Sequence, residues 1–92
     1  MTNDPHHTRR KRLKFRAWHR GMQEADLILG RFANARLADM TADELDQFEA
    51  LLEEVDQDIL DWLMGRAPVP AEADSPVVQE LLLFDFKDSV PQ

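Results

Sequence analysis

The hydrophobic positions of this 92-residue chain recur every three or four residues, which is the spacing of an amphipathic helix. The clearest run has apolar side chains at intervals of three, four and three: Leu45, Phe48, Leu52 and Val55. The alternating pattern of a half-buried strand is absent, and β-branched residues are few. The pattern therefore predicts helices and no sheet.

Local signals indicate where several of these helices begin and end. Thr41 followed by Glu44 is the sequence of a capping box, and Ser75-Pro76 is typical of an N-cap followed by proline at the first helical position. Gly65 suits the residue just after a helix end. For the short helix before it, we expect Asp56 or Asp58 to serve as the cap.

Together these signals predict an all-α protein, a compact five-helix bundle in a single domain. The expected helices cover about 8–19, 22–37, 41–55, 56–64 and 76–86, and two prolines make 65–75 a surface connection. We expect flexible segments at 1–7 and 87–92 on either side of a domain spanning 8–86. Gly30, inside the second helix, predicts close packing of a neighbour there.

Charge is divided unevenly along the chain. The first twenty residues hold seven of the eleven basic residues and one acidic residue, a net charge of +6, whereas residues 21–92 carry −13. At helical spacing, four arginines fall on one face of the first helix: Arg9, Arg12, Arg16 and Arg20. A basic helix on an acidic body favours an oriented contact with a partner.

This basic face has three interpretations. It is a solvated surface, a nucleic-acid-binding helix with interleaved Phe15 and Trp18, or a docking surface for an acidic protein. The charge of −13 on the remaining chain repels phosphates, so we expect no nucleic-acid partner.

Patterns that carry chemistry are missing. Without cysteine, disulfides and thiolate-bound metals are excluded, and isolated glycines make no phosphate-binding loop. The three histidines lack a second ligand at helical spacing, and the aspartates at 56, 58 and 61 lack the glycine and glutamate of a calcium loop. We expect no catalytic residue, no metal and no enzymatic activity. No apolar run reaches the roughly 20 residues of a membrane span.

The segment 20–24, Arg-Gly-Met-Gln-Glu, lies between the first two helices. Gly21 permits the backbone geometry of a tight corner, and Glu24 suits the first turn of the second helix, where a carboxylate complements the helix dipole. The residues alone favour an ordinary helix junction. They also allow a compact docking point in which exposed Arg20 and Glu24 flank the glycine.

This segment is similar to the R-G-x-x-E signature of the succinate dehydrogenase assembly factor family, the flavinylation factors. The basic and aromatic stretch 12–19 resembles the residues that precede the signature in that family. The stretch 48–65, which contains Asp56 and ends in Trp62-Leu63-Met64-Gly65, resembles a second family segment. The resemblance covers about residues 9–85.

The resemblance implies a five-helix bundle that acts as an assembly factor or chaperone and is not an enzyme. Such a protein binds the flavoprotein subunit of succinate dehydrogenase and promotes covalent attachment of FAD to a histidine of that subunit. FAD then belongs to the partner, and this chain has no cofactor of its own. The flavoprotein of fumarate reductase is left open as a second client.

Within the signature, the resemblance makes Arg20, Gly21 and Glu24 the partner-binding residues. We expect them to form one exposed patch that is extended by Arg16, Arg12 and Arg9, with His19 at the interface. A monomer is expected, located in the bacterial cytoplasm or, in a eukaryote, the mitochondrial matrix. The alternatives are a nucleic-acid-binding or antitoxin-like regulatory module that acts through the basic first helix, and an enzyme with its own flavin site.

Overall fold

The computed structural model describes residues 4–84. This range contains five α-helices, two 3-10 turns and no strand, which confirms the predicted all-α class. The elements are α1 (His7–Trp18), α2 (Gln23–Arg36), η1 (Leu37–Asp39), α3 (Ala42–Leu52), α4 (Asp56–Leu63), η2 (Ala71–Ala73) and α5 (Pro76–Leu83). Residues 1–3 and 85–92 lie outside the described range, so flexibility at 1–3 and 87–92 stays a prediction. Within the segment 1–7 that was expected to be flexible, His7 is the first residue of α1.

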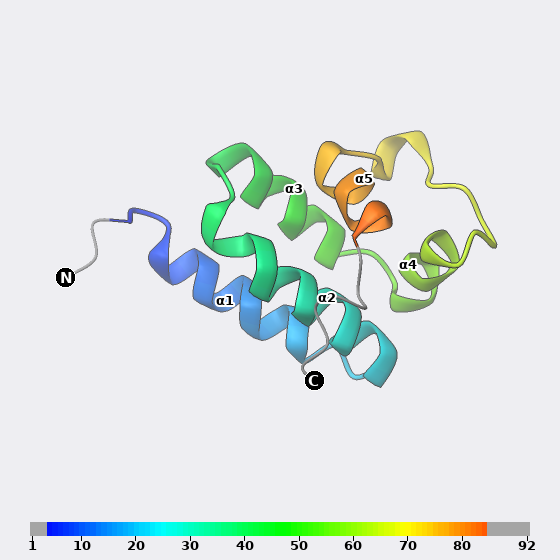
Figure 1. The fold of residues 1–92 in the computed structure, drawn as a ribbon, viewed down its shortest axis with the longest axis horizontal. Coiled ribbons are helices and arrows are strands. Elements are labelled where there is room, and N and C mark those ends of the chain that lie inside the picture. Colours follow the sequence, from blue (N-terminus) through cyan, green and yellow to red (C-terminus); the bar gives the residue numbers. More distant parts are fainter. Residues whose placement is uncertain (1–3, 85–92) are drawn as a thin grey trace.

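The helices form one bundle in which α1 and α2 run side by side in opposite directions (Figure 1). α3 packs against α1 and is covered by α5, whereas α4 lies beyond the end of α3 and contacts α2. The long connection between α4 and α5 carries η2 and loops away from the α1–α2 pair (Figure 1). The junction of α1 with α2 is therefore close to the junction of α3 with α4.

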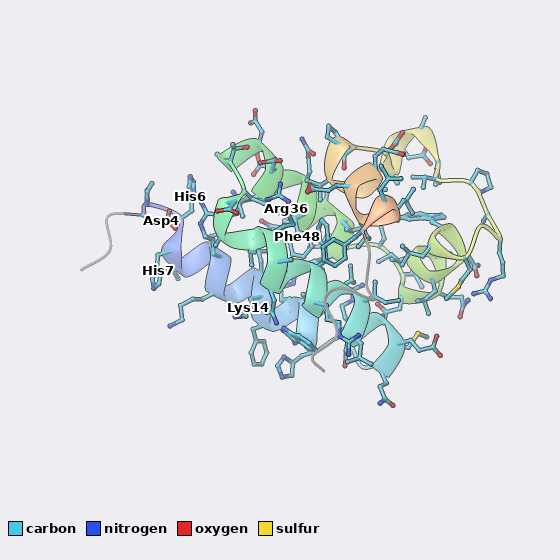
Figure 2. All side chains as sticks on the ribbon, in the orientation of Figure 1. Asp4, His6, His7, Lys14, Arg36 and Phe48 are labelled. Atoms are coloured by element: carbon cyan, nitrogen blue, oxygen red, sulfur yellow. The ribbon has the colours of Figure 1, made fainter. Side chains whose placement is uncertain are left out.

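Aromatic residues fill the centre of the bundle. Phe32 on α2 and Phe48 on α3 are fully buried, and their ring centroids are 6.0 Å apart. Phe84, after α5, meets Phe32 edge-on at 5.3 Å. Figure 2 shows Phe48 pointing into the interior between the helices. Phe48 belongs to the apolar run predicted from the sequence, and burying these large rings together with the surrounding aliphatic side chains favours closing the bundle.

Two of the predicted helix starts are confirmed. Thr41 Oγ1 accepts a hydrogen bond from the Glu44 backbone N–H at 3.2 Å, and the Glu44 carboxylate accepts from the Thr41 N–H at 2.9 Å. This reciprocal pair is the predicted capping box. At the start of α5, Ser75 Oγ accepts from the Val78 N–H at 3.2 Å, and Pro76 is the first helical residue.

The predicted cap of α4 is wrong. The N-cap residue is Val55, and neither Asp56 nor Asp58 accepts a capping hydrogen bond from the helix backbone. Asp56 is instead the first residue of α4, and its carboxylate is directed to an arginine from the α1–α2 corner. At the other end of α4, Gly65 has φ +73°, as expected for the residue after a helix end.

Gly30 allows α1 and α2 to approach closely. A Cβ atom built on Gly30 would lie 2.2 Å from Cδ2 of Trp18, far closer than the van der Waals contact distance between two carbon atoms. The ring is held over the glycine by a hydrogen bond from Trp18 Nε1 to Asn34 Oδ1, at 3.3 Å. The close packing predicted at Gly30 is confirmed, and it fixes the separation of the two helices that meet at the corner.

Candidate functional site

The corner between α1 and α2 consists of residues 19–22. Gly21 has φ +92°, a conformation that residues with a side chain adopt only with strain. A Cβ atom there would have no neighbour within 4 Å, so the surrounding space is open. Gly21 is thus required for the turn of the backbone, and it leaves an exposed stretch of main chain that another molecule can approach closely.

Arg20 is directed inward from this corner. Its Nε donates to Asp56 Oδ1 at 2.6 Å, its Nη2 donates to the Glu54 carbonyl oxygen at 2.7 Å, and its Nη1 donates to the Leu52 carbonyl oxygen. The side chain is only 11% exposed, and that of Asp56 is 18% exposed. A cationic side chain that binds the last carbonyls of a helix satisfies groups that have no intrahelical partner. Arg20 therefore joins the end of α3 to the start of α4.

The main chain of the corner is fixed as well. The Arg20 backbone N–H donates to Asp26 Oδ1 at 2.6 Å, which ties the end of the corner to the first turn of α2. Asp26 and Asp56 were not among the predicted site residues, although they hold the corner in its shape. Asp56 lies in the second family-like segment, but nothing in the sequence pairs either aspartate with Arg20. The carbonyl oxygens of Leu52 and Glu54 carry no sequence signal at all.

The expectation that Arg20 is exposed is therefore wrong. Its guanidinium forms an ion pair with Asp56 and does not pair with Glu24. The physical reason is that the corner packs on the junction of α3 with α4, where three acceptors already face it. Gly21 and Glu24 remain at the surface, as expected.

Glu24 has the opposite character. It lies in the first turn of α2, is exposed, and has no hydrogen-bond or ion-pair partner among residues 4–84. Its carboxylate complements the positive end of the helix dipole, and no other described side chain binds it. Glu24 is thus an acceptor without a partner in residues 4–84, three positions after the open glycine backbone.

The basic face of α1 lies partly against α3. Arg9 donates to Asp46 at 2.6 Å and to Glu49 at 2.9 Å, and the hydrogen bond with Asp46, followed by that with Glu49, raises the pKa of Arg9 above its usual value. Arg16 donates to Glu53 at 3.1 Å. Three of the predicted basic residues, counting Arg20, therefore have acidic partners within the chain.

Arg12 differs from these arginines. It is exposed and makes no hydrogen bond or ion pair within the part of the chain that the structure describes. Arg9, Arg12 and Arg16 line one open hollow together with Leu13 and Glu49. The sequence thus placed these arginines on the correct shared face, but the acidic residues of α3 leave only Arg12 fully available to another molecule.

His19 and Phe15 form an exposed aromatic pair at the end of α1. Their ring centroids are 3.9 Å apart with an interplanar angle of 17°, and His19 Nδ1 lies 2.7 Å from the Phe15 carbonyl oxygen. Phe15 is 63% exposed. Together with Arg16 and Arg20, the two rings line a second open hollow. Phe15 was not predicted as a site residue, although its spacing of four from His19 on a helix is a signal that could have indicated the pair.

The other two histidines lie elsewhere. His6 and His7 are at the start of α1, near Asp4, and so at the opposite end of that helix from His19 (Figure 2). Over residues 4–84, no group of three or more histidine, aspartate or glutamate side chains is arranged to hold a metal ion. In the same range, no helix combines the length and the apolar character needed to cross a membrane. What the corner offers is donors, acceptors and an aromatic surface, which suit recognition of another macromolecule.

Comparison with known proteins places this corner inside a matched family region. A family model described as the flavinator of succinate dehydrogenase matches residues 11–85. The FAD assembly factor SdhE of Acetobacter pasteurianus is 46% identical over 74 residues, which are 80% of this chain and 68% of the relative.

Mitochondrial proteins match as well. Succinate dehydrogenase assembly factor 2 of Dictyostelium discoideum is 37% identical over 70 residues, 76% of this chain and 50% of the relative. The protein of the same name from Yarrowia lipolytica is 41% identical over 78 residues, 80% of this chain and 54% of the relative. The chain therefore spans about half the length of these mitochondrial relatives. Because the matched region contains the whole α1–α2 corner and the helices that support it, the chain belongs to the succinate dehydrogenase flavinator family.

Proposed function

We propose that this chain is an assembly factor that binds the flavoprotein subunit of succinate dehydrogenase and promotes covalent attachment of FAD to a histidine of that subunit. The observation that carries the proposal is the corner at Gly21. In a chain of this family, Gly21 exposes its backbone on a corner that Arg20 fixes from within, and Glu24, three residues later, is exposed and has no partner among residues 4–84.

The chain's role is to bind and orient. FAD supplies the reactivity for the new bond and is held by the flavoprotein, so the proposal assigns no cofactor and no catalytic residue to this chain. Binding energy spent on holding the flavoprotein in one arrangement brings the histidine and the flavin into productive geometry. This division of work requires a rigid docking surface, which the internally bonded corner provides.

Individual residues have separate roles in this proposal. Glu24 accepts hydrogen bonds from the flavoprotein, and Gly21 allows the two main chains to come close. Arg12, with Arg16, Arg9 and His19 around it, extends the contact along α1. Arg20 acts from inside the corner, because its guanidinium is already occupied by α3 and α4.

The proposal also covers the client range and the cellular setting. The chain acts as a monomer on succinate dehydrogenase, with the fumarate reductase flavoprotein as a second client. It works in the compartment in which the flavoprotein acquires FAD, the cytoplasm of a bacterium or the mitochondrial matrix of a eukaryote. The nucleic-acid-binding alternative has no support in the family match, and the pairing of Arg9 and Arg16 with α3 carboxylates reduces the positive charge available to phosphates.

The test is to replace Glu24 by glutamine and to measure covalent flavin on the succinate dehydrogenase flavoprotein in cells that lack their own factor. We expect Glu24→Gln to lower covalent flavin about ten-fold, in line with the loss of a central polar contact. The matched control is Glu72→Gln on η2, since Glu72 is also exposed and unpaired among the described residues. If a folded, normally expressed Glu24 variant leaves flavinylation unchanged, the assignment of the corner is wrong.

A further inference from the structure

We propose that Phe15, held in place by His19, is an aromatic anchor that inserts into an apolar pocket of the flavoprotein subunit whose rim carries acidic side chains. This inference rests on the proposed function and adds to it a residue, a kind of contact and the chemistry of the facing surface.

The first argument is the position of Phe15. The apolar residues that α1 contributes to the core are Leu13 and Ala17, which are 2% and 0% exposed. Phe15 lies between them in sequence and is 63% exposed, so it is directed away from the core. A large ring in this position contributes little to folding, whereas burying it in a partner removes a large apolar area from water.

The second argument is that the ring is already ordered. It stacks on the His19 ring with centroids 3.9 Å apart, and His19 Nδ1 lies within hydrogen-bond distance of the Phe15 carbonyl oxygen, at 2.7 Å. The His19 backbone N–H also donates to the Arg16 carbonyl oxygen, which anchors the residue to the end of α1. An anchor that is fixed before binding loses little conformational entropy on binding, and such preordered aromatics dominate the energy of many interfaces.

The third argument is the charge around the ring. No acidic residue occurs between positions 5 and 23. Four cationic residues lie within four positions of Phe15 on α1: Lys11, Arg12, Lys14 and Arg16. Of these, only Arg16 has an acidic partner among residues 4–84. The complementary surface is therefore an apolar pocket rimmed by carboxylates.

The fourth argument is continuity with the corner. Phe15, Arg16, His19 and Arg20 line one open hollow, and the chain continues from Arg20 directly into Gly21. A flavoprotein that contacts Gly21 and Glu24 thus has the aromatic pair next to it. Met64, which is 57% exposed, lies at the end of α4 and has no stacked partner ring among the described residues.

A second copy of this chain is a poorer occupant. A symmetric dimer through this surface would bring each patch against itself, and the cations of α1 would then face their own copies. Like charges placed opposite each other across an interface disfavour association. The flavoprotein is therefore the occupant to which the inference commits.

The decisive measurement is the affinity of the full-length chain for the purified flavoprotein subunit from the same cell. We expect Phe15→Ala to weaken binding ten-fold or more and Phe15→Trp to restore most of it. Met64→Ala is the matched control and should leave affinity within two-fold, since it also removes an exposed apolar side chain. Circular dichroism and thermal melting should show all variants folded, because neither residue belongs to the core.

A photo-crosslinking residue at position 15 identifies what the ring touches. p-Benzoylphenylalanine in place of Phe15 should crosslink to the flavoprotein in the purified mixture, and the crosslinked peptide should contain apolar residues with Asp or Glu beside them. Crosslinking to a second copy of the chain, or to nucleic acid added in equal amount, would overturn the inference.

The outcomes separate this inference from the proposed function. If the wild-type chain binds the flavoprotein and Phe15→Ala binds equally well, the anchor is wrong and the proposed function stands. If the wild-type chain does not bind the flavoprotein at all, the proposed function fails and the anchor with it. Weaker binding by Phe15→Ala with unchanged binding by Met64→Ala supports both.

Discussion

The inner and outer sides of the α1–α2 corner use their polar groups in opposite ways. On the inner side, Arg20 and the carboxylates of Asp26 and Asp56 are all engaged, in contacts that connect the corner to α2, to the end of α3 and to the start of α4. On the outer side, Glu24 has no partner in the described residues, and the main chain at Gly21 faces open space. Arg20 on the inner side and Gly21 and Glu24 on the outer side belong to one five-residue motif.

This contrast shows that a motif need not be functional in the same way at each position. We expect substitution of Arg20 to act by moving the corner and substitution of Glu24 to act by removing a contact with the partner. Stability measurements distinguish the two, because only the inner side holds the helices together.

The largest effect is expected for Arg20→Ala. The change leaves the Asp56 carboxylate and two carbonyl oxygens without their donor, and breaking a largely buried pair of this kind costs about 3 kcal/mol. Urea unfolding measures the loss. Arg20→Lys should recover only part of it, because one ammonium cannot reach three acceptors arranged for a guanidinium.

The control for this measurement is Arg12→Ala, which removes an arginine that has no partner among residues 4–84 and should change stability by less than about 0.5 kcal/mol. Equal losses for the two variants would contradict the division into an inner and an outer side.

A smaller effect is expected at the two glycines with positive φ. Gly21→Ala and Gly65→Ala both place a Cβ in open space at a left-handed conformation, so each should cost about 1 kcal/mol from backbone strain alone. Covalent flavin on the flavoprotein should fall with Gly21→Ala and not with Gly65→Ala. A similar fall for both would mean that stability, and not the surface at the corner, limits the activity.

The smallest effect is expected at the start of α3, remote from the corner. Thr41→Ala should cost about 1 kcal/mol or less and leave flavinylation unchanged.

Because the Thr41 backbone N–H lowers the pKa of Glu44, the charged Glu44 stabilises the fold above its unfolded pKa of about 4.3, and this contribution is lost as pH falls through the lower folded value. The stability difference between wild type and Glu44→Gln should therefore shrink between about pH 5 and about pH 3, as followed by denaturation. A stability difference that is constant across this pH range would show that the charged Glu44 carboxylate does not stabilise the capping box.

The parts of the fold that depend on neighbouring residues were predictable. The helices follow from the three- and four-residue spacing of apolar positions, and the capping box at Thr41 and the Ser75-Pro76 start are signals within four residues. The close approach at Gly30 also followed from the cost of a glycine inside a helix. The helices and their caps depend on residues close in the sequence, and for Gly30 the sequence indicated a close neighbour without identifying it as Trp18.

The arrangement of the corner was not predictable in the same way. The acceptors of Arg20 are 32 to 36 residues away along the chain, and two of them are main-chain carbonyls that any residue provides. For the same reason, the sequence placed Asp56 as a cap when it serves as an ion-pair partner. The shared face of the arginines was predicted correctly from periodicity, but which of them would meet α3 carboxylates depends on how α1 packs on α3.

The contact between Trp18 and Gly30 has a consequence for how this protein tolerates change. The indole occupies the volume where a Cβ at position 30 would be. The side chains at positions 18 and 30 therefore have to share one limited volume. A library that randomises both positions should yield folded chains in which one of the two residues is large and the other is small. It should yield almost no folded chains in which both residues are large. The two helices that carry the corner are thus coupled sterically, because a larger side chain at one of these positions requires a smaller side chain at the other.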